Sequence, residues 1–565
     1  MYHLLSFSLL ALSVIAAPVE IRAARPSVTI ANGTVVGSTT GVVDSFRGIP
    51  FAQPPIGDLR LRAPGSINTS FGTISDNPLP RACPQFYTSV NSGLLPVDAI
   101  SVLSNTPFAQ AITFAGEDCL TINVQRPATT VATSKLPVVF WIFGGGFELG
   151  STQVYDGTTF VSKSIQLNAP VIYVAVNYRV GGFGFLASSS LAQEGSTNLG
   201  LRDQRLGLQW VQENIAASGG DPDKVTIWGE SAGSISAFDH TVINGGDHTY
   251  NGKARFRGAI MDSGSVVATN DVTTSKAQVI YDNVVAGAGC SSSTDTLTCL
   301  RQADYTTLLN AMKSAPGLLG YRAVDLAYLP RPDAGDNFYS RSPELSIDDG
   351  AFAKVPIIIG DQQDEGTLFS LAQSNITTNA RLIQYLASYF PTDANAVADI
   401  TGLVANYPDQ PLLGQPAGSP FNTGVLNNIY PQYKRLAAIL GDLIFTLARR
   451  NYLDKVASQV PAWSYLATYF AGTPVLGTFH ATDIAVDFFI PGIPQQPVLT
   501  YYISFINKLD PNALTTAAPL ITWPRWTSGA PQLINFGALR NSLIPDTFRQ
   551  AASDYLATKQ SVFSL

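Results

Sequence analysis

The stretch that decides the fold is Gly229-Glu230-Ser231-Ala232-Gly233, which follows the apolar run Val225-Thr226-Ile227-Trp228. The apolar run is typical of a buried strand, and the Ala/Ser/Ile-rich residues after Gly233 are typical of a helix. A serine between two glycines at a strand-to-helix junction is the pattern of a nucleophile elbow, because small residues let the strand and the helix cross closely. The pattern predicts that the Ser231 hydroxyl is exposed above one edge of a sheet.

A serine hydroxyl is a weak nucleophile and needs a base within hydrogen-bond reach. The chain has four histidines. His3 lies in an apolar N-terminal segment, and His240 lies about 13 Å from Ser231 along the axis of the same expected helix. His248 follows an Asn-Gly-Gly-Asp sequence that is typical of a surface turn. Elimination leaves His480, shortly after a strand-like run, as the predicted base.

The base needs a carboxylate that orients the imidazole and stabilises the imidazolium. In the fold that a nucleophile elbow indicates, this acid lies between the serine and the histidine, near the C-terminal end of a strand. The buried-strand pattern of residues 355–360 is followed by an acidic turn. Spacing alone leaves Asp361, Asp364 and Glu365 as alternatives.

Acyl transfer also needs donors for the negative oxygen of the tetrahedral intermediate. The buried-strand pattern of residues 138–143 ends in Gly144-Gly145-Gly146-Phe147. Three consecutive glycines can turn backbone N–H groups toward a small site that no side chain obstructs. Together with the amide of Ala232, which follows the nucleophile, they predict an oxyanion hole.

Further motifs extend along most of the chain. They are Phe46-Arg47-Gly48-Ile49-Pro50-Phe51-Ala52-Gln53-Pro54-Pro55, Glu117-Asp118-Cys119-Leu120-Thr121-Ile122-Asn123-Val124, Trp141 to Gly150, Asn177-Tyr178-Arg179, Asn198 to Gln204, and Gly360 to Thr367. With the elbow, these motifs resemble the type-B carboxylesterase family on the α/β-hydrolase fold, and in particular its fungal Candida rugosa lipase-like branch of lipases and sterol esterases. The resemblance runs from about Val28 to the C-terminus.

The resemblance implies a role for each matching residue. It implies Ser231 as nucleophile, Glu365 as the acid and His480 as the base. It also implies that Gly145, Gly146 and Ala232 donate to the oxyanion. Phe143 stands where many esterases of the family carry histidine, and the lipase branch tolerates phenylalanine there.

The pattern of apolar runs predicts an α/β fold. Runs that end at Phe143, Tyr178, Trp228, Met261, Gly360 and Leu466 predict buried strands separated by helical or irregular segments, and hence a mostly parallel central sheet. Residues 27–30, 34–36 and 42–46 predict a small N-terminal antiparallel sheet. Since the predicted site residues span positions 145 to 480, we expect residues 26–565 to form one α/β-hydrolase catalytic domain.

The composition favours a lipid substrate over a nucleic acid. Charged residues make up 13% of the chain, against roughly 25% in typical soluble proteins. The mean hydropathy is +0.14, which leaves room for an exposed apolar face that docks to lipid. The net charge of −7 argues against nucleic-acid binding. We expect neither a metal nor a cofactor.

The N-terminus resembles a secretion signal. Residues 4–17 are almost wholly apolar, too short to span a bilayer, and followed by small residues. We therefore expect residues 1–17 to be a signal peptide, with cleavage near residues 16–25, and the mature protein to be secreted. Glycosylation sequons begin at Asn32, Asn68 and Asn375.

Export favours a disulfide role for the four cysteines. Of the three possible pairings, the resemblance implies Cys83 with Cys119 and Cys290 with Cys299. These two pairings also close the shortest loops.

The loop between Cys83 and Cys119 is unusually apolar for a surface excursion. It carries Leu94, Leu95, Val97, Ile100, Val102, Leu103, Phe108, Ile112 and Phe114. We expect a lid that covers the active-site mouth when closed and presents its apolar face to a lipid interface when open. The alternative is that these residues are permanently packed core. Apolar lid surfaces could also pair two molecules into a homodimer.

Three functions are compatible with these features. The first is a lipase or sterol esterase that acts on long-chain acyl esters, with Leu368, Phe369 and Phe147 lining the acyl site. The second is a soluble carboxylesterase or cholinesterase-like enzyme for short esters. Choline recognition favours a tryptophan face, and none of the six tryptophans lies between Cys83 and Cys119. The third is a non-catalytic adhesion protein of the same fold, which the presence of Ser231 disfavours.

Overall fold

The computed structural model describes residues 25–86, 96–104, 106, 112–410, 412, 425–492, 494–514, 520–560 and 562–565. An 11-stranded sheet crosses the centre of the molecule, with the strand order β16-β15-β14-β13-β12-β9-β7-β8-β6-β4-β3. Its strands are β3 (Ser38–Thr39), β4 (Val43–Pro50), β6 (Thr121–Pro127), β7 (Leu136–Ile142), β8 (Ile172–Val176), β9 (Gly220–Glu230), β12 (Gly258–Asp262), β13 (Ile357–Gln362), β14 (Ala462–Ala467), β15 (Gln532–Phe536) and β16 (Ser542–Pro545).

The middle of this sheet is parallel and both edges are antiparallel. Every neighbouring pair from β8 through β7, β9, β12, β13 and β14 to β15 is parallel. The pairs β15–β16, β8–β6, β6–β4 and β4–β3 are antiparallel. All residues of β8, β12, β13 and β14 are buried, as expected for strands with both faces covered. The predicted α/β fold and its six buried strands are confirmed.

The N-terminal sheet differs in membership from the prediction. Strands β1 (Ser27–Ile30) and β2 (Gly33–Val36) form the expected antiparallel pair, and β5 (Gly72–Ser75) adds to β2 in parallel. The third predicted strand is instead the start of β4 in the large sheet. The reason is burial: four successive residues, 43–46, are all buried, so both faces of this strand need cover, which a small surface sheet does not supply.

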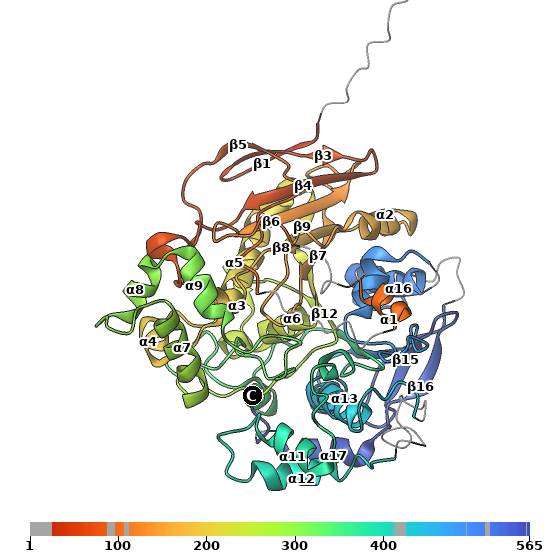
Figure 1. The fold of residues 1–565 in the computed structure, drawn as a ribbon. Coiled ribbons are helices and arrows are strands. Elements are labelled where there is room, and N and C mark those ends of the chain that lie inside the picture. The colour runs from red at the N-terminus through yellow and green to blue at the C-terminus, as the bar shows by residue number, and fades with distance from the viewer. Residues whose placement is uncertain are drawn as a thin grey trace, which may run out of the picture.

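The helices cover both faces of the large sheet (Figure 1). They are α1 (Val97–Leu103), α2 (Thr158–Gln166), α3 (Gly181–Phe185), α4 (Ser189–Glu194), α5 (Leu199–Asn214), α6 (Ala232–Val242), α7 (Ser275–Gly287), α8 (Thr296–Gln302), α9 (Tyr305–Lys313), α10 (Pro343–Asp348), α11 (Asn379–Ala387), α12 (Ala396–Val404), α13 (Tyr433–Gly441), α14 (Leu447–Val456), α15 (Thr482–Ile484), α16 (Gln495–Lys508) and α17 (Gln550–Lys559). Helices α5 and α6 contact each other and β9. Helices α2 and α16 contact each other, and they contact the sheet at β4, β6 and β8 (α2) and at β7 and β9 (α16).

Two short strands, β10 (Thr249–Tyr250) and β11 (Lys253–Ala254), form a separate hairpin. In the part of the chain that the structure describes, no helix has the length and apolar character needed to cross a membrane. The parallel strands place their C-terminal ends at one edge of the sheet. Loops that follow β7, β9, β13 and β14 therefore converge at this edge, where α/β proteins bind their ligands.

Candidate active site

Ser231 lies on a strained turn between β9 and α6. Its φ of 54° and ψ of −124° form a conformation that residues with a side chain rarely adopt. A Cβ on Gly229 would lie 2.1 Å from the carbonyl oxygen of Gly233, and a Cβ on Gly233 would lie 2.0 Å from that of Ile142. Both glycines are therefore required by the close crossing of strand and helix. The turn between them places Ser231 at an internal cavity, where it is buried and not exposed as the sequence pattern predicted.

The structure brings Ser231, His480 and Glu365 together in one continuous hydrogen-bonded relay. His480 Nε2 lies 2.7 Å from Ser231 Oγ, and His480 Nδ1 lies 2.5 Å from Glu365 Oε2. The imidazole is buried, with the rings of Phe369 and Phe445 at centroid distances of 5.0 and 4.7 Å. When Nδ1–H donates to the carboxylate, Nε2 is the nitrogen that accepts the serine proton.

Two of the three candidate acids hold the loops around this relay. Glu365 Oε1 accepts a hydrogen bond of 2.7 Å from the Gln362 amide, which fixes the carboxylate against His480. Asp364 Oδ2 accepts a hydrogen bond of 2.8 Å from the Thr478 amide, and its own amide donates to the Thr478 carbonyl at 2.9 Å. Burial raises the pKa of Asp364 to about 7. Asp364 thus fastens the loop that carries His480. It is not a member of the hydrogen-bonded relay, in which Glu365 contacts the imidazole.

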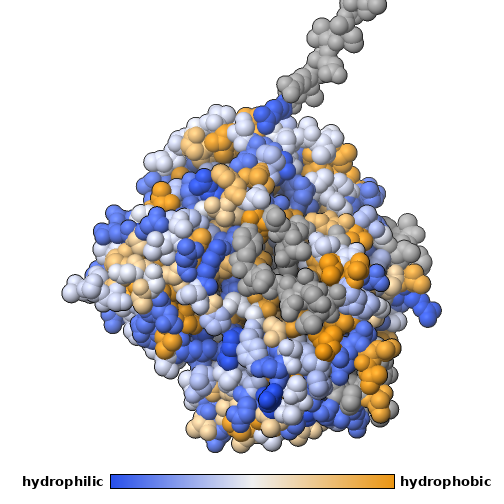
Figure 2. Space-filling model, viewed as in Figure 1, coloured by the Kyte–Doolittle hydropathy of each residue, from blue (hydrophilic) through white to orange (hydrophobic). Residues whose placement is uncertain are grey.

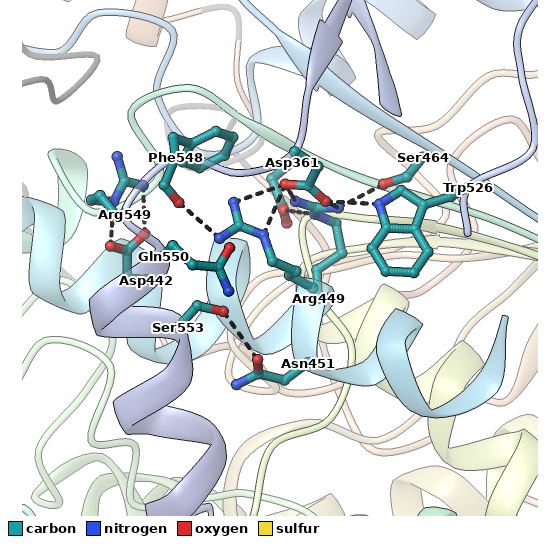
Figure 3. A network of polar contacts seen from close by, with 12 residues as sticks. Asp361, Asp442, Arg449, Asn451, Ser464, Trp526, Phe548, Arg549, Gln550 and Ser553 are labelled. Atoms are coloured by element: carbon teal, nitrogen blue, oxygen red, sulfur yellow. Dashed lines mark hydrogen bonds and ion pairs between the residues drawn. The ribbon is translucent and has the colours of Figure 1, made fainter. Parts of the chain in front are cut away.

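The third candidate, Asp361, belongs to a buried ion network (Figure 3). Its Oδ2 lies 2.7 Å from Arg449 Nε, and Arg449 Nη1 also lies 2.8 Å from Asp546 Oδ2 and 2.8 Å from Ser464 Oγ. Arg449 comes from α14, and Asp546 follows β16. Because removal of one partner leaves a buried charge uncompensated, this network ties α14 to the end of the sheet that carries the acid.

The glycine triplet turns sharply beside the elbow. Gly145 and Gly146 have φ values of 107° and 62°, which favour glycine. A Cβ on Gly144 would lie 2.9 Å from Ser231 Cβ, and one on Gly145 would lie 2.4 Å from the Leu149 carbonyl oxygen. No larger residue fits this turn, so no side chain of the triplet obstructs the backbone amides beside the serine.

A narrow cavity lies in front of Ser231. Gly146 and Ala232, two of the three predicted oxyanion donors, line it together with the serine. The rest of the lining is apolar and comes from distant parts of the chain: Phe147, Ile235, Val267, Leu318, Val324, Leu326, Leu329, Phe369, Ile444, Phe445 and Leu565. An apolar cavity of this kind suits a hydrocarbon chain.

Two of the three residues predicted for the acyl site lie at this cavity. Phe147 and Phe369 line the cavity, whereas Leu368 is buried elsewhere and is not among the lining residues. Leu368 and Phe369 belong to one 3₁₀ turn. Successive residues in such a turn point in directions about 120° apart, so only one of the two faces the cavity.

Four buried carboxylates near the relay were missed by the sequence analysis: Glu230, Asp262, Asp483 and Asp487. Glu230 Oε1 lies 3.5 Å from His480 Nε2 and has no hydrogen-bond partner in the described part of the chain. Burial, followed by repulsion among these acids, raises the pKa of Glu230, Asp483 and Asp487, and burial raises that of Asp262 to about 6. The spacing of Asp483 and Asp487 in an apolar stretch, which is typical of one helix face, was a usable signal.

The other histidines lie in different surroundings. His240 is buried on α6, with Nε2 lying 3.0 Å from Gln204 Oε1, and burial lowers its pKa well below the usual value. His248 lies in the turn after α6, with Nδ1 at 3.4 Å from the Gly246 carbonyl oxygen. His3 lies outside the described residues.

The cysteines are paired as the resemblance implied. Cys83 is bonded to Cys119, and Cys290 to Cys299. Between the first pair, the described apolar side chains divide: Leu103 and Ile112 are buried, whereas Val97 and Phe114 are 81% and 56% exposed. Leu94, Leu95 and Phe108 lie outside the described residues. The described part of this segment is therefore partly packed against the core and partly exposed.

The three sequons differ in accessibility. The Asn32 Nδ2 amide donates to the carbonyl oxygens of Ile67 and Thr69 at 3.2 and 3.4 Å. Asn68 and Asn375 are exposed.

The fold and the site together define the class of protein. A mostly parallel sheet carries a serine elbow after β9, a carboxylate after β13 and a histidine after β14, which is the chain order of α/β-hydrolases. The chain belongs to the carboxylesterase family, since the model of that family matches residues 24–548.

Relatives match along nearly the whole chain. Secreted lipase 1 of Botryotinia fuckeliana is 53% identical over 97% of this chain and 95% of its own length. Secreted triacylglycerol lipase LIP1 of Gibberella zeae is 50% identical over 95% and 91%, respectively. Among solved structures, EstA of Aspergillus niger is 26% identical, with a TM-score of 0.76 over 96% of this chain and 99% of that one.

Proposed function

We propose that this protein is a secreted lipase that hydrolyses carboxylic esters of long-chain fatty acids, including triacylglycerols and sterol esters. The observation that carries the proposal is the relay from Ser231 through His480 to Glu365 beside an apolar cavity. Family membership supports ester hydrolysis. The names of the two fungal relatives support a lipid ester as the substrate.

The reaction proceeds through an acyl-enzyme. Ser231 Oγ attacks the ester carbonyl carbon while His480 Nε2 takes its proton, and Glu365 stabilises the resulting imidazolium. The amides of Gly145, Gly146 and Ala232 stabilise the oxyanion. The imidazolium then protonates the departing alcohol, which leaves the acyl group on the serine.

Water completes the cycle. His480 removes a proton from the water molecule as its oxygen attacks the acyl carbon, and the second tetrahedral intermediate collapses to release the fatty acid and restore the Ser231 hydroxyl. No group is oxidised or reduced.

The segment between Cys83 and Cys119 is proposed as a lid that opens at lipid interfaces. Exposed apolar residues at Val97, Ile100 and Phe114 support this role. Figure 2 shows further hydrophobic side chains on the same face of the molecule. An exposed apolar surface of this kind gains free energy when a lipid aggregate covers it. We also propose that two molecules pair through this surface and form a homodimer when no lipid is present. Sedimentation with and without detergent tests this pairing.

Residues 1–17 are proposed as a signal peptide and residues 26–565 as one catalytic domain. The fungal relatives that are named secreted support export. Exposure of Asn68 and Asn375 favours glycosylation there over Asn32, which is half-buried. Mass spectrometry of the secreted protein, with and without glycosidase treatment, tests both the cleavage site and the modified asparagines.

A hydrolysis panel tests the proposed substrate class. It compares cholesteryl oleate, triolein, tributyrin and nitrophenyl esters of rising chain length, with and without detergent. We expect hydrolysis of triolein or cholesteryl oleate, and a rise in rate once tributyrin exceeds its solubility limit. A rate that stays proportional to substrate through that limit contradicts the lid, and hydrolysis of short esters alone favours a soluble carboxylesterase. Ser231→Ala should lower kcat by about 10⁴-fold or more on every cleaved ester.

A further inference from the structure

Glu148 is a buried acid that the proposed reaction does not use. Its side chain is only 1% exposed. Its Oε2 accepts a hydrogen bond of 2.7 Å from the amide of Leu318. Its Oε1 has no hydrogen-bond partner among the described residues. A buried carboxyl group with one unpartnered oxygen is costly, so its single contact calls for a functional explanation.

That contact holds a residue of the cavity wall. Leu318 lines the cavity in front of Ser231. Its side chain also lies directly on Gly146, where an added Cβ would be 2.9 Å from both terminal carbons of the leucine. Leu319, the next residue, has a φ of 64°, a strained conformation that persists only when its surroundings hold it.

The backbone of Glu148 joins the same residue to two other segments. Its amide donates to the Gly145 carbonyl at 3.0 Å and closes the glycine turn, while its carbonyl accepts from the Phe86 amide at 2.9 Å. Phe86 lies just beyond Cys83, at the base of the proposed lid. One residue therefore connects the glycine turn, the lid base and the loop that bears Leu318.

We propose that Glu148 is a positioning residue that holds Leu318 against Gly146 and thereby sets the fit of the acyl chain in the cavity. This inference rests on the proposed ester hydrolysis. The contact between acyl chain and cavity wall grows with every methylene. A displaced Leu318 therefore penalises an octanoyl group more than an acetyl group, so the ratio of the two substrates reports the position of the wall.

The charge state of Glu148 provides a readout that a purely structural residue lacks. Burial raises the pKa of Glu148 to about 8, so the group is neutral at neutral pH and ionises above that value. Ionisation puts a charge on a carboxyl group whose second oxygen has no partner among the described residues. The bond from the Leu318 amide favours the charged form, but the unpartnered oxygen draws water into the apolar wall, and this water displaces the leucine side chain. Tyr328 is a titratable residue close to Glu148. Burial, followed by repulsion from Glu148, raises the pKa of Tyr328. The Tyr328 hydroxyl donates to the Met312 carbonyl at 2.7 Å.

The test measures the ratio of kcat/KM for nitrophenyl octanoate to that for nitrophenyl acetate, from pH 6 to pH 9.5. Any effect that acts equally on both substrates cancels in this ratio. In the wild type we expect the ratio to fall by about fivefold or more as pH rises through 8, the scale of one mismatched apolar contact. Glu148→Gln keeps an acceptor for Leu318 but cannot ionise, so its ratio should stay constant. Glu148→Leu should show a lowered ratio at every pH.

Gln373→Leu is the matched control. Gln373 Nε2 donates to the carbonyl oxygens of Gly320 and Tyr321 at 3.3 and 3.0 Å, and so holds the same loop two residues beyond Leu318. We expect this variant to lower the thermal midpoint while it keeps the wild-type ratio and its pH dependence. That difference separates positioning at the cavity from general loop stability.

Three results would overturn the inference. The wild-type ratio could stay constant with pH, or the Glu148→Gln ratio could follow the wild-type curve. The third is a folded Glu148→Leu variant that keeps the wild-type ratio. If Glu148→Leu does not fold, the wild-type and Glu148→Gln curves decide the question. Failure of the proposed function is distinguishable, because an enzyme that cleaves both soluble esters but neither triolein nor cholesteryl oleate contradicts that function and leaves this test intact.

Discussion

Glu365 and Asp364 are adjacent carboxylates with different partners, and this difference separates their functions. Glu365 faces the imidazole of His480, whereas Asp364 accepts a hydrogen bond from the Thr478 amide. Since asparagine retains the acceptor that Thr478 needs, its introduction at position 364 preserves the contact. Glutamine at position 365 cannot stabilise the imidazolium.

We expect Glu365→Gln to lower kcat by about 10³- to 10⁴-fold and Asp364→Asn to lower it by less than about tenfold. Steady-state hydrolysis of nitrophenyl acetate measures both, with circular dichroism as the control for folding. A reversed order, with Asp364→Asn as the crippling change, would show that Asp364 is the acid.

The site residues could be predicted from the sequence to different degrees. Ser231 followed from the glycines around it, and His480 followed from elimination among four histidines. Glu365 came from the family resemblance, because three acids in one turn are equivalent by spacing. Only the folded chain distinguishes Asp364 from Glu365. Their respective partners, Thr478 and His480, lie more than a hundred residues further along the chain.

At the scale of secondary-structure elements, the close crossing of β9, α6 and β7 is the critical contact. A Cβ on Gly233 would lie 2.0 Å from the Ile142 carbonyl oxygen. Gly233→Ala should therefore reduce the free energy of unfolding by about 1–3 kcal/mol and lower activity through displacement of the elbow.

The matched control for this substitution is Gly472→Ala. Nothing lies within 4 Å of a Cβ at that position, so stability and activity should stay close to the wild type. Urea denaturation and nitrophenyl ester hydrolysis measure both variants. Equal stability of the two alanine variants would contradict the proposed steric requirement.

The two disulfides should differ in their effect on stability. Cys83–Cys119 spans 36 residues and Cys290–Cys299 spans 9. On the chain-entropy relation, removal of the first should cost about 4 kcal/mol and of the second about 2.6 kcal/mol. Double serine variants compared by urea denaturation test the order. A larger loss at the shorter loop would mean that native contacts, and not chain entropy, dominate.

Element types were predictable where the chain is strongly apolar. The six buried strands were visible as short runs of β-branched and aromatic residues. The start of β4 was assigned to the wrong sheet, because alternation and turn residues predict a strand but do not say which neighbour it pairs with.

On the scale of the whole molecule, buried acids make stability depend on pH. Burial raises the pKa of Asp364 to about 7 and that of Asp262 to about 6, so the folded state binds protons that the unfolded state has released. The free energy of unfolding therefore falls as pH rises from about 4 to about 7, by up to about 1.4 kcal/mol per pH unit for each group.

The opposite trend holds in acid. Hydrogen bonds and charge from Arg47 outweigh burial and lower the pKa of Asp76, so protonation of Asp76 below its unfolded-state pKa removes stability. Together these groups predict greatest stability at mildly acidic pH. Urea midpoints at pH 3, 5 and 8 test this, and Asp364→Asn should flatten the decline between pH 5 and 8. A steady rise in midpoint from pH 5 to 8 would contradict the assignment.

The amino-acid sequence by itself determined the elbow, the strand pattern and the glycine turn, because each depends on steric properties of residues close together in the chain. It also led to His480 as the predicted base, by elimination among four histidines. Only the tertiary structure decided which acid meets the imidazole, which side chains line the cavity and how Glu148 reaches Leu318. These are contacts between distant segments, and their geometry is set by how the helices and loops pack on the sheet, which no local pattern records.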